Sequence, residues 1–273
     1  MLAAATRGAF AADGVTEIGR FHAAEARQGV AVDARHFYAI DDRAIGKYEK
    51  ASGRRVAHDE GPVGGPISHL NGGVVSGERL YCAHSNYPAI PPTSSIEIWD
   101  TATLAHVDTH SFGISEGWLT WIDFYQNAWW AVFAHYGKTR RETGKDAAWT
   151  RLVRLGPRWQ PEAAWVLPAD LLRRFGDYSS SGGSWSADGE LYVTGHDRPE
   201  LFALRLPGAG STLELTRVLP VPTPGQGIAW DRGQPGVLYA LDRPRQDIVI
   251  LRIDAATQAR RPAAMPGAAD SGN

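Results

Sequence analysis

Cysteine is almost absent from this chain, and long apolar runs and an excess of either charge are missing. Its 273 residues include one cysteine, Cys82, which excludes an internal disulfide and a multi-cysteine zinc site. No apolar stretch approaches the roughly 18 residues of a membrane span, so we expect a soluble protein without membrane contact. Lysine and arginine total 28 against 30 acidic residues, a net charge of -2 that predicts no nucleic-acid partner.

The two ends of the chain differ in composition from its middle. The segment Ala9-Phe10-Ala11 is similar to a signal cleavage site, but no basic and long apolar segments precede it. Residues 1–14 are therefore either a signal remnant of a periplasmic or secreted protein, or the flexible start of a cytoplasmic one. Residues 255–273 are rich in Ala, Pro and Gly, which predicts disorder. We expect one domain over residues 15–254, and a monomer.

One motif occurs five times between these ends. It is a glycine-led apolar strand, a turn, and an aromatic-rich strand that ends in a polar residue. The copies are QGVAVDARHFYAID (28–41), NGGVVSGERLYCAH (71–84), GWLTWIDFYQNAWWAVFAH (117–135), GGSWSADGELYVTGH (182–196) and QGIAWDRGQPGVLYALD (226–242). A third alternating strand follows each copy, and a fourth follows each of the first four copies.

Units of four antiparallel strands, repeated about every 45 residues, predict the blades of a β-propeller. The fifth unit lacks its fourth strand, and TEIGRF at 16–21 is an unmatched strand before the first unit. We therefore expect this N-terminal strand to join the last blade and close the ring. Ile96-Glu97-Ile98-Trp99-Asp100 resembles the strand ending of WD40-type blades, and residues 16–253 are similar to the β-propeller superfamily with WD40- or YVTN-like blades. This resemblance implies an all-β, five-bladed fold and carries no activity with it.

The alternating strand directions bring two sets of polar residues to one face of the ring. The second strands end in Asp41, His84, His135, His196 and Asp242. The first strands are preceded by Gln28, His69, Asn71, Glu116, Ser181 and Gln226. A random polar surface would show many Lys, Arg and Glu instead. The three histidines and two aspartates therefore predict a functional site at the mouth of the central channel.

A divalent metal ion is the cofactor that these side chains predict. Imidazole and carboxylate groups suit zinc, manganese or iron, with calcium as a further alternative. We expect His84, His135 and His196 to bind the ion and to leave a position open for water or substrate. The alternative for each histidine is a hydrogen-bonded packing role at a strand end. The spacing before His196 is one residue longer than in three other units, which predicts a bulge at Gly195.

Two residues are the candidates for proton transfer at this mouth, Glu116 and His69, with an exposed loop charge as the alternative for Glu116. The candidates for substrate binding are polar groups and neighbouring aromatic rings. They are Asp41, Asp242, Gln28, Gln226, Asn71, Ser181, Tyr87, Trp118 and Tyr136. Their alternatives are turn hydrogen bonds, local ion pairs, bridges between blades and ordinary rim aromatics. The remaining strand tryptophans are predicted to pack the core.

Two functions fit this pattern. The first is a metal-assisted hydrolase, lyase or isomerase that acts on a small polar ligand such as a carbohydrate or lactone. The second is a non-catalytic propeller that binds a glycan or a protein. The mouth loops lack the broad apolar patch typical of a protein interface, which favours the enzyme. No Gly-x-Ser-x-Gly motif surrounds the serines of residues 179–181, which argues against a serine hydrolase.

Overall fold

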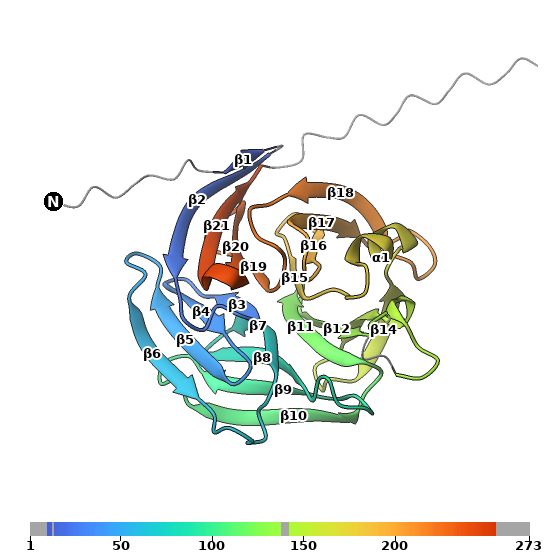
Figure 1. Ribbon diagram of the computed structural model, residues 1–273, viewed down its shortest axis with the longest axis horizontal. Helices are drawn as coiled ribbons and strands as arrows, with labels where there is room; N and C mark the ends of the chain where they lie inside the picture. The colour runs from blue at the N-terminus through green and yellow to red at the C-terminus, as the bar shows by residue number, and fades with distance from the viewer. Residues whose placement is uncertain (1–9, 13, 138–141, 255–273) are drawn as a thin grey trace, which may run out of the picture.

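Five antiparallel sheets stand side by side around a central axis and close into a ring, as Figure 1 shows for the computed structural model of the chain. The structure describes residues 10–12, 14–137 and 142–254. Of the predicted signal remnant or flexible start at residues 1–14, residues 1–9 and 13 lie outside the described residues, as does the predicted disordered tail at 255–273. The five-bladed β-propeller predicted from the repeats is confirmed.

In the first four blades the strands follow one another from the axis outward. Blade 1 holds β3 (Gly29–Val32), β4 (His36–Ile40), β5 (Ala44–Glu49) and β6 (Arg55–Glu60). Blade 2 holds β7 (Leu70–Ser76), β8 (Arg79–Ser85), β9 (Thr93–Asp100) and β10 (His106–Ile114). Blade 3 holds β11 (Trp118–Tyr125), β12 (Ala128–Ala134), β13 (Arg151–Leu155) and β14 (Pro161–Val166). Blade 4 holds β15 (Gly182–Trp185), β16 (Leu191–Thr194), β17 (Glu200–Arg205) and β18 (Glu214–Pro220).

The fifth blade joins the two ends of the propeller, as the surplus N-terminal strand predicts. Its inner strands are β19 (Ile228–Trp230), β20 (Val237–Asp242) and β21 (Asp247–Ile253), and its outer strands are β2 (Val15–His22) and β1 (Ala11–Ala12). Strand β2 pairs antiparallel with β21, from Val15 opposite Ile253 to His22 opposite Asp247. In Figure 1 the blue and red strands lie side by side at this point. Within residues 10–12, 14–137 and 142–254, the short strand β1 is the one strand that the sequence does not predict.

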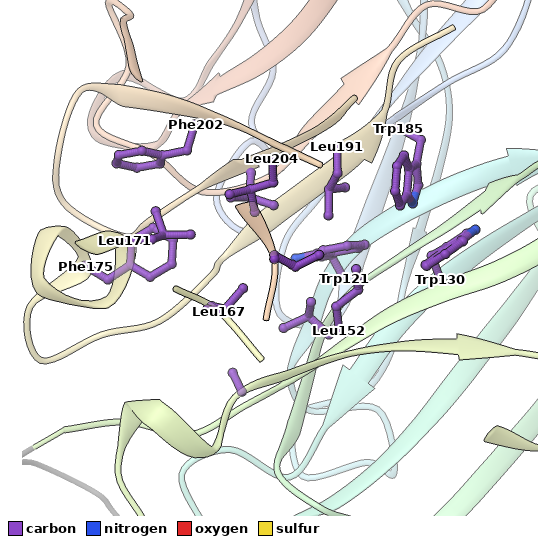
Figure 2. Close-up of a cluster of buried hydrophobic side chains, with 14 residues drawn as sticks. Trp121, Trp130, Leu152, Leu167, Leu171, Phe175, Trp185, Leu191, Phe202 and Leu204 are labelled. Carbon is purple, nitrogen blue, oxygen red and sulfur yellow. The ribbon is translucent and has the colours of Figure 1, made fainter. Parts of the chain in front are cut away.

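Among the described residues, the buried apolar side chains form five clusters, each between two neighbouring blades. Figure 2 shows the cluster between blades 3 and 4, where Trp121, Trp130 and Trp185 meet. The helix α1 (Ala169–Phe175) adds Leu171 and Phe175 to this cluster. Two short 3-10 helices, η1 (Ala147–Trp149) and η2 (Arg243–Arg245), lie in loops. None of the helices in the described ranges is long and apolar enough to cross a membrane.

Glycines at the start of the inner strands let the blades meet backbone to backbone. A Cβ atom on Gly29 would lie 2.4 Å from the carbonyl oxygen of Asn71, and one on Gly182 would lie 2.3 Å from that of Gln226. These approaches leave no room for any side chain. The glycine that leads the repeated motif therefore has a steric cause.

At the other end of the channel, an ion pair joins blades 3 and 5. Asp123, near the end of β11, accepts a hydrogen bond from Nη2 of Arg232 at 2.7 Å. Asp123 is 1% exposed and also accepts from the backbone N–H of Trp185 at 2.7 Å. Burial raises the pKa of Asp123, and the nearby Arg232 charge acts in the opposite direction. This contact ties together strands that lie far apart in sequence.

Candidate functional site at the channel mouth

Six aromatic rings from blades 2, 3 and 4 form a continuous row at the predicted face, which we name the aromatic arc. Its members are His69, Tyr87, Trp118, Tyr136, Tyr178 and His196. The tyrosine rings are joined through Tyr136, whose centroid lies 5.2 Å from that of Tyr87 and 6.3 Å from that of Tyr178. These separations are typical of interacting aromatic pairs. The arc brings together five residues predicted from the sequence and adds Tyr178.

Each end of the arc is a histidine that stacks on a tyrosine and binds an aspartate. His69 stacks on Tyr87 with centroids 5.2 Å apart, and its Nδ1 lies 2.7 Å from Oδ1 of Asp42. His196 stacks on Tyr178 with centroids 3.9 Å apart, and its Nδ1 hydrogen-bonds to the neighbouring Asp197. The mouth therefore carries two imidazoles whose orientation is fixed by a carboxylate and a ring.

The bond to Asp42 determines which nitrogen of His69 carries the proton. Because a carboxylate only accepts, Nδ1 of the neutral ring donates to it and Nε2 keeps a lone pair. Within the described part of the chain, Nδ1 is the only ring nitrogen of His69 that makes a hydrogen bond. His69 is 18% exposed in its side chain. A half-buried imidazole in this tautomer has the form of a general base.

Asp42 and its neighbour Asp41 differ in their electrostatic surroundings. Burial acts to raise the pKa of Asp42, but hydrogen bonds from His69 and Gln28 outweigh it, so the pKa lies below its usual value. Burial raises the pKa of Asp41, and the negative charge of Asp42 adds to this rise. Asp41 also accepts from the backbone N–H of Asp42 at 2.8 Å. Asp42 is thus the carboxylate that remains charged beside His69.

The loop that carries Tyr87 is held by one asparagine. The side-chain oxygen of Asn86 accepts from the backbone N–H of Thr93 at 2.9 Å, and its Nδ2 donates to the carbonyl of Pro91 at 3.0 Å. The backbone N–H of Asn86 also donates to the carbonyl of Thr93 at 3.1 Å. The proline-rich segment 86–93 is therefore closed on itself, and it presents Tyr87 to the arc.

Buried serines hold the loop that carries Tyr178. Oγ of Ser180 accepts from Nε1 of Trp121 at 2.9 Å, and the carbonyl of Ser180 accepts from the hydroxyl of Thr120 at 2.8 Å. The hydroxyl of Ser179 lies 2.7 Å from that of Thr150. These bonds run from the loop into blade 3, so the position of Tyr178 depends on two blades. The predicted candidate Ser181 instead donates its backbone N–H to Thr194.

His84 has the packing role that was the alternative to metal binding. Its Nε2 accepts from the backbone N–H of Ser68 at 3.1 Å, so its Nδ1 donates to Oγ of Ser95 at 2.8 Å. Ser95 in turn donates to Oε1 of Glu97 at 2.6 Å. Burial lowers the pKa of His84, which keeps the ring neutral. Both ring nitrogens are thus occupied, and His84 lies outside the aromatic arc.

The three histidines predicted as metal ligands are not brought together. His135 is 1% exposed, and its Nε2 donates to the carbonyl of Glu116 at 3.2 Å. His196 uses Nδ1 for Asp197. Over residues 10–12, 14–137 and 142–254, no group of three or more His, Cys, Asp or Glu is arranged to hold a metal ion. The predicted trio does not fit a shared ion, because both ring nitrogens of His84 already have hydrogen-bond partners.

Two predicted carboxylates have structural partners instead of facing the arc. Asp242 is 0% exposed, and its Oδ2 binds both Arg20 and Arg245 at 2.9 Å, which ties β2 into blade 5. Glu116 has an exposed side chain, 78%, that lies 3.4 Å from Nζ of Lys145. A carboxylate so open to water lacks the burial that tunes a general base. The exposed-loop alternative for Glu116 therefore describes its contact with Lys145. Asp242 forms ion pairs with Arg20 and Arg245.

The remaining polar candidates surround the start of the inner strands. Nε2 of Gln28 donates to Oδ1 of Asp42 at 2.8 Å, and Nδ2 of Asn71 lies 3.4 Å from the carbonyl of His69. Gln226 is 3% exposed, and the backbone N–H of Gly227 donates to the carbonyl of Gln28 at 3.1 Å. These contacts place the glutamines of blades 5 and 1 beside each other, next to the Asp42–His69 pair.

The bulge predicted at Gly195 is wrong. Strands β15 and β16 pair in regular register from Gly182 opposite Thr194 to Trp185 opposite Leu191. Strand β16 ends at Thr194, so His196 lies in the following loop. The alternation of side chains along a strand therefore does not determine the side to which His196 points. A Cβ atom on Gly195 would lie 2.8 Å from Cδ1 of Phe175 in α1, which explains the glycine by close packing.

Comparison with proteins of known structure supports the fold. The PQQ-bound aldose sugar dehydrogenase from Streptomyces coelicolor has a TM-score of 0.54 and 12% identity, over 88% of this chain and 98% of its own. A luciferin-regenerating enzyme has a TM-score of 0.50 and 12% identity, over 92% and 96%. A chain of the mitotic checkpoint complex has a TM-score of 0.50 and 9% identity, over 93% and 98%.

No protein-family model matches the chain, and no curated protein matches it in sequence. The structural neighbours include enzymes as well as a checkpoint assembly, at 9–12% identity. One propeller fold supports many unrelated activities, so these neighbours show the fold alone. Function must be argued from the channel mouth of this chain.

Proposed function

We propose that the channel mouth binds a small, polar, ring-shaped ligand, a carbohydrate or lactone, and that His69 accepts a proton from it. The observation that carries this proposal is the 2.7 Å bond from Nδ1 of His69 to Asp42, with the His69 ring stacked on Tyr87. It couples an oriented base to a surface on which a ring can pack. Hydrolases, lyases and isomerases all use proton transfer of this kind.

The aromatic arc supplies the binding surface. Sugar and lactone rings present C–H groups to the faces of aromatic side chains, and such packing contributes through buried area and favourable electrostatics. The hydroxyls of Tyr136 and Tyr178 offer polar partners to the substituents of the ring. Burial, together with the neighbouring hydroxyls of Tyr87 and Tyr178, raises the pKa of Tyr136. Tyr136 therefore stays protonated and can donate to a ligand oxygen at neutral pH.

The proton transfer follows from the contacts of His69. Nε2 takes a proton from the ligand, and the resulting imidazolium is stabilised by the carboxylate of Asp42 at 2.7 Å. Asp42 retains its charge because hydrogen bonds from His69 and Gln28 outweigh its burial and hold its pKa low. This proton transfer therefore needs no group other than His69, Asp42 and Gln28 of this chain.

A divalent metal ion at this mouth stays a prediction. It would need ligands other than the trio of His84, His135 and His196, whose contacts do not fit one ion. Metal analysis of the purified protein by mass spectrometry tests it. About one equivalent of a transition metal would support the prediction, and no bound metal after loading with zinc, manganese and iron would contradict it.

Proton transfer is tested without knowing the reaction. Each sugar or lactone of a panel is incubated in deuterium oxide with the protein, and proton NMR follows binding, turnover and loss of carbon-bound hydrogen. We expect deuterium incorporation or turnover that is lost in His69→Gln and kept in His22→Gln. His22 is the matched control because it also bonds an aspartate, Asp247, at 3.3 Å, but on the outer strand of blade 5.

The outcome also separates catalysis from simple binding. Ligand binding without any exchange or turnover would contradict the enzyme and favour the non-catalytic propeller. Exchange that survives in His69→Gln would assign the base to another residue. No binding by any sugar or lactone would contradict the site itself.

A further inference from the structure

Three hydrogen-bond donors near the mouth lack acceptors within the described part of the chain. Nε1 of Trp118 and Nε2 of Gln226 are both buried and have no hydrogen-bond partner there. Arg243 is half-buried, and none of the ion pairs or hydrogen bonds among described residues involves its guanidinium. A buried donor without a partner is destabilising, so such groups mark places where a ligand or water binds.

The carboxylates of blade 1 at the mouth already have partners. Oδ1 of Asp42 accepts from both His69 and Gln28. Asp41 accepts from the backbone of Asp42 and lies 3.5 Å from Nε of Arg27. Beside them, the three donors face one buried acceptor without a partner in the described part of blade 5, Oδ1 of Asp242. A ligand with an acceptor group and hydroxyl donors is complementary to this set.

Two of the three donors lie on the same side of the mouth. Gln226 precedes Gly227, whose N–H donates to the carbonyl of Gln28, the residue that binds Asp42. Arg243 lies close enough to Asp42 that its positive charge contributes to lowering the pKa of that carboxyl. Trp118 belongs to the aromatic arc, formed by blades 2 to 4, while Gln226 and Arg243 belong to blade 5.

We propose that the ligand is a ring compound with one carboxylate, such as a hexuronate, whose carboxylate binds Arg243 and the amide of Gln226. Its ring packs on the aromatic arc, and a ring oxygen or hydroxyl accepts from Nε1 of Trp118. The planar guanidinium matches the two oxygens of a carboxylate. This inference rests on the proposed function for the binding of the ring and adds the acidic substrate class.

The local charges favour one negative charge on the ligand. Arg27 and Arg243 offset Asp41 and Asp42, so this side of the mouth is close to neutral before His69 gains a proton. A phosphate with two charges would meet the carboxylate of Asp42 without an added cation. A single carboxylate needs only the guanidinium of Arg243.

Calorimetric titration of matched ligands tests the inference. Each hexuronate is compared with the neutral hexose of the same stereochemistry and with its neutral hexuronolactone. We expect the best acid to bind at least about tenfold more tightly than its neutral partners, because charge-assisted hydrogen bonds are among the stronger ones. Arg243→Gln should remove this difference and leave the binding of the neutral ring unchanged.

The matched control is Arg245→Gln. Arg245 lies two residues further on, has a 58% exposed side chain and binds Asp242, which also binds Arg20. It should retain the preference for the acid. Equal binding of acid and neutral ring, or a preference that survives in Arg243→Gln, would overturn the inference and leave the ring-binding proposal standing. No binding by any of these rings, acidic or neutral, would overturn both.

Discussion

Asp42 of blade 1 bonds His69 at the start of blade 2, with 2.7 Å between Oδ1 and Nδ1. The same carboxylate oxygen accepts from Gln28, which precedes the inner strand of blade 1. The orientation of the imidazole is therefore set at the junction of two blades. A ring of blades makes such a junction rigid, because each blade is packed on both sides.

Replacing Asp42 by Asn tests this relationship. An amide presents both a donor and an acceptor, so it no longer requires the Nδ1–H form of His69. We expect nitrogen-15 NMR to show one tautomer of His69 in the wild type and a mixture in Asp42→Asn. Proton transfer to the ligand should fall at least about tenfold. Asp247→Asn alters the corresponding partner of His22, and it should change neither the tautomer of His69 nor the rate of proton transfer. A single unchanged tautomer in Asp42→Asn would contradict the account.

Tyr136 joins the two halves of the aromatic arc, and Tyr136→Ala should weaken ligand binding about tenfold. The loss corresponds to a stacked ring that contributes ~0.5–1.5 kcal/mol beyond its buried area. Tyr136→Phe keeps the ring and should retain most of the affinity in calorimetric titrations. Tyr125→Ala is the control, because Tyr125 stacks on Trp185 at 5.1 Å at the other end of β11. If both alanine variants bind equally well, the arc is not the binding surface.

The loop that carries Tyr178 is tested at Ser180. Removing its hydroxyl leaves Nε1 of Trp121 buried without an acceptor, so Ser180→Ala should lower the free energy of unfolding by about 1–3 kcal/mol. It should also weaken ligand binding, because Tyr178 loses its support. Ser52→Ala, at an exposed hydroxyl that bonds Glu49, should stay within about 0.5 kcal/mol of wild type. Urea denaturation measures the free energy of unfolding of both variants. Equal values for Ser180→Ala and Ser52→Ala would show that Ser180 does not hold the loop.

His84 gives the stability of the fold a pH dependence. Burial lowers its pKa in the folded state, so the unfolded chain binds the proton more readily. Its contribution is complete above the unfolded value of about 6.5 and is lost as the pH falls toward the folded pKa. In urea denaturation we expect His84→Gln to reduce the decline in stability between about pH 7 and pH 5. His22→Gln, at an exposed side chain, should leave the decline unchanged, and an undiminished slope in His84→Gln would contradict the buried neutral ring.

The fold could be predicted from the sequence because its repeats depend on local physics. Alternating strands, turn glycines and the surplus strand before Gln28 determine the blade count and the closure by β2. The mouth was predicted for the same reason, since strand direction alone decides which loops share a face. The tryptophans predicted as packing residues also lie in or against the clusters between blades.

The details of the site could not be predicted, because they depend on loop conformations and on long-range hydrogen bonds. Asp42 was not among the candidates predicted from the sequence, yet it binds His69 in the next blade. Tyr178 lies in a loop noted for its serines, and the buried bonds of Ser179 and Ser180 hold that loop against blade 3. Conversely, His84 was expected at the mouth, and its two partners within blade 2 and its preceding loop were not visible from spacing.

The most direct test of the binding site is an NMR titration. The protein is labelled at its histidine and tyrosine side chains, and the ring ligands that bind are added to it. The account predicts that the signals of His69, Tyr87, Tyr136, Tyr178 and His196 shift together and saturate with one dissociation constant. Shifts confined to other residues, such as His110 beside Trp159 on the outer face of blade 2, would contradict a ligand site at the channel mouth.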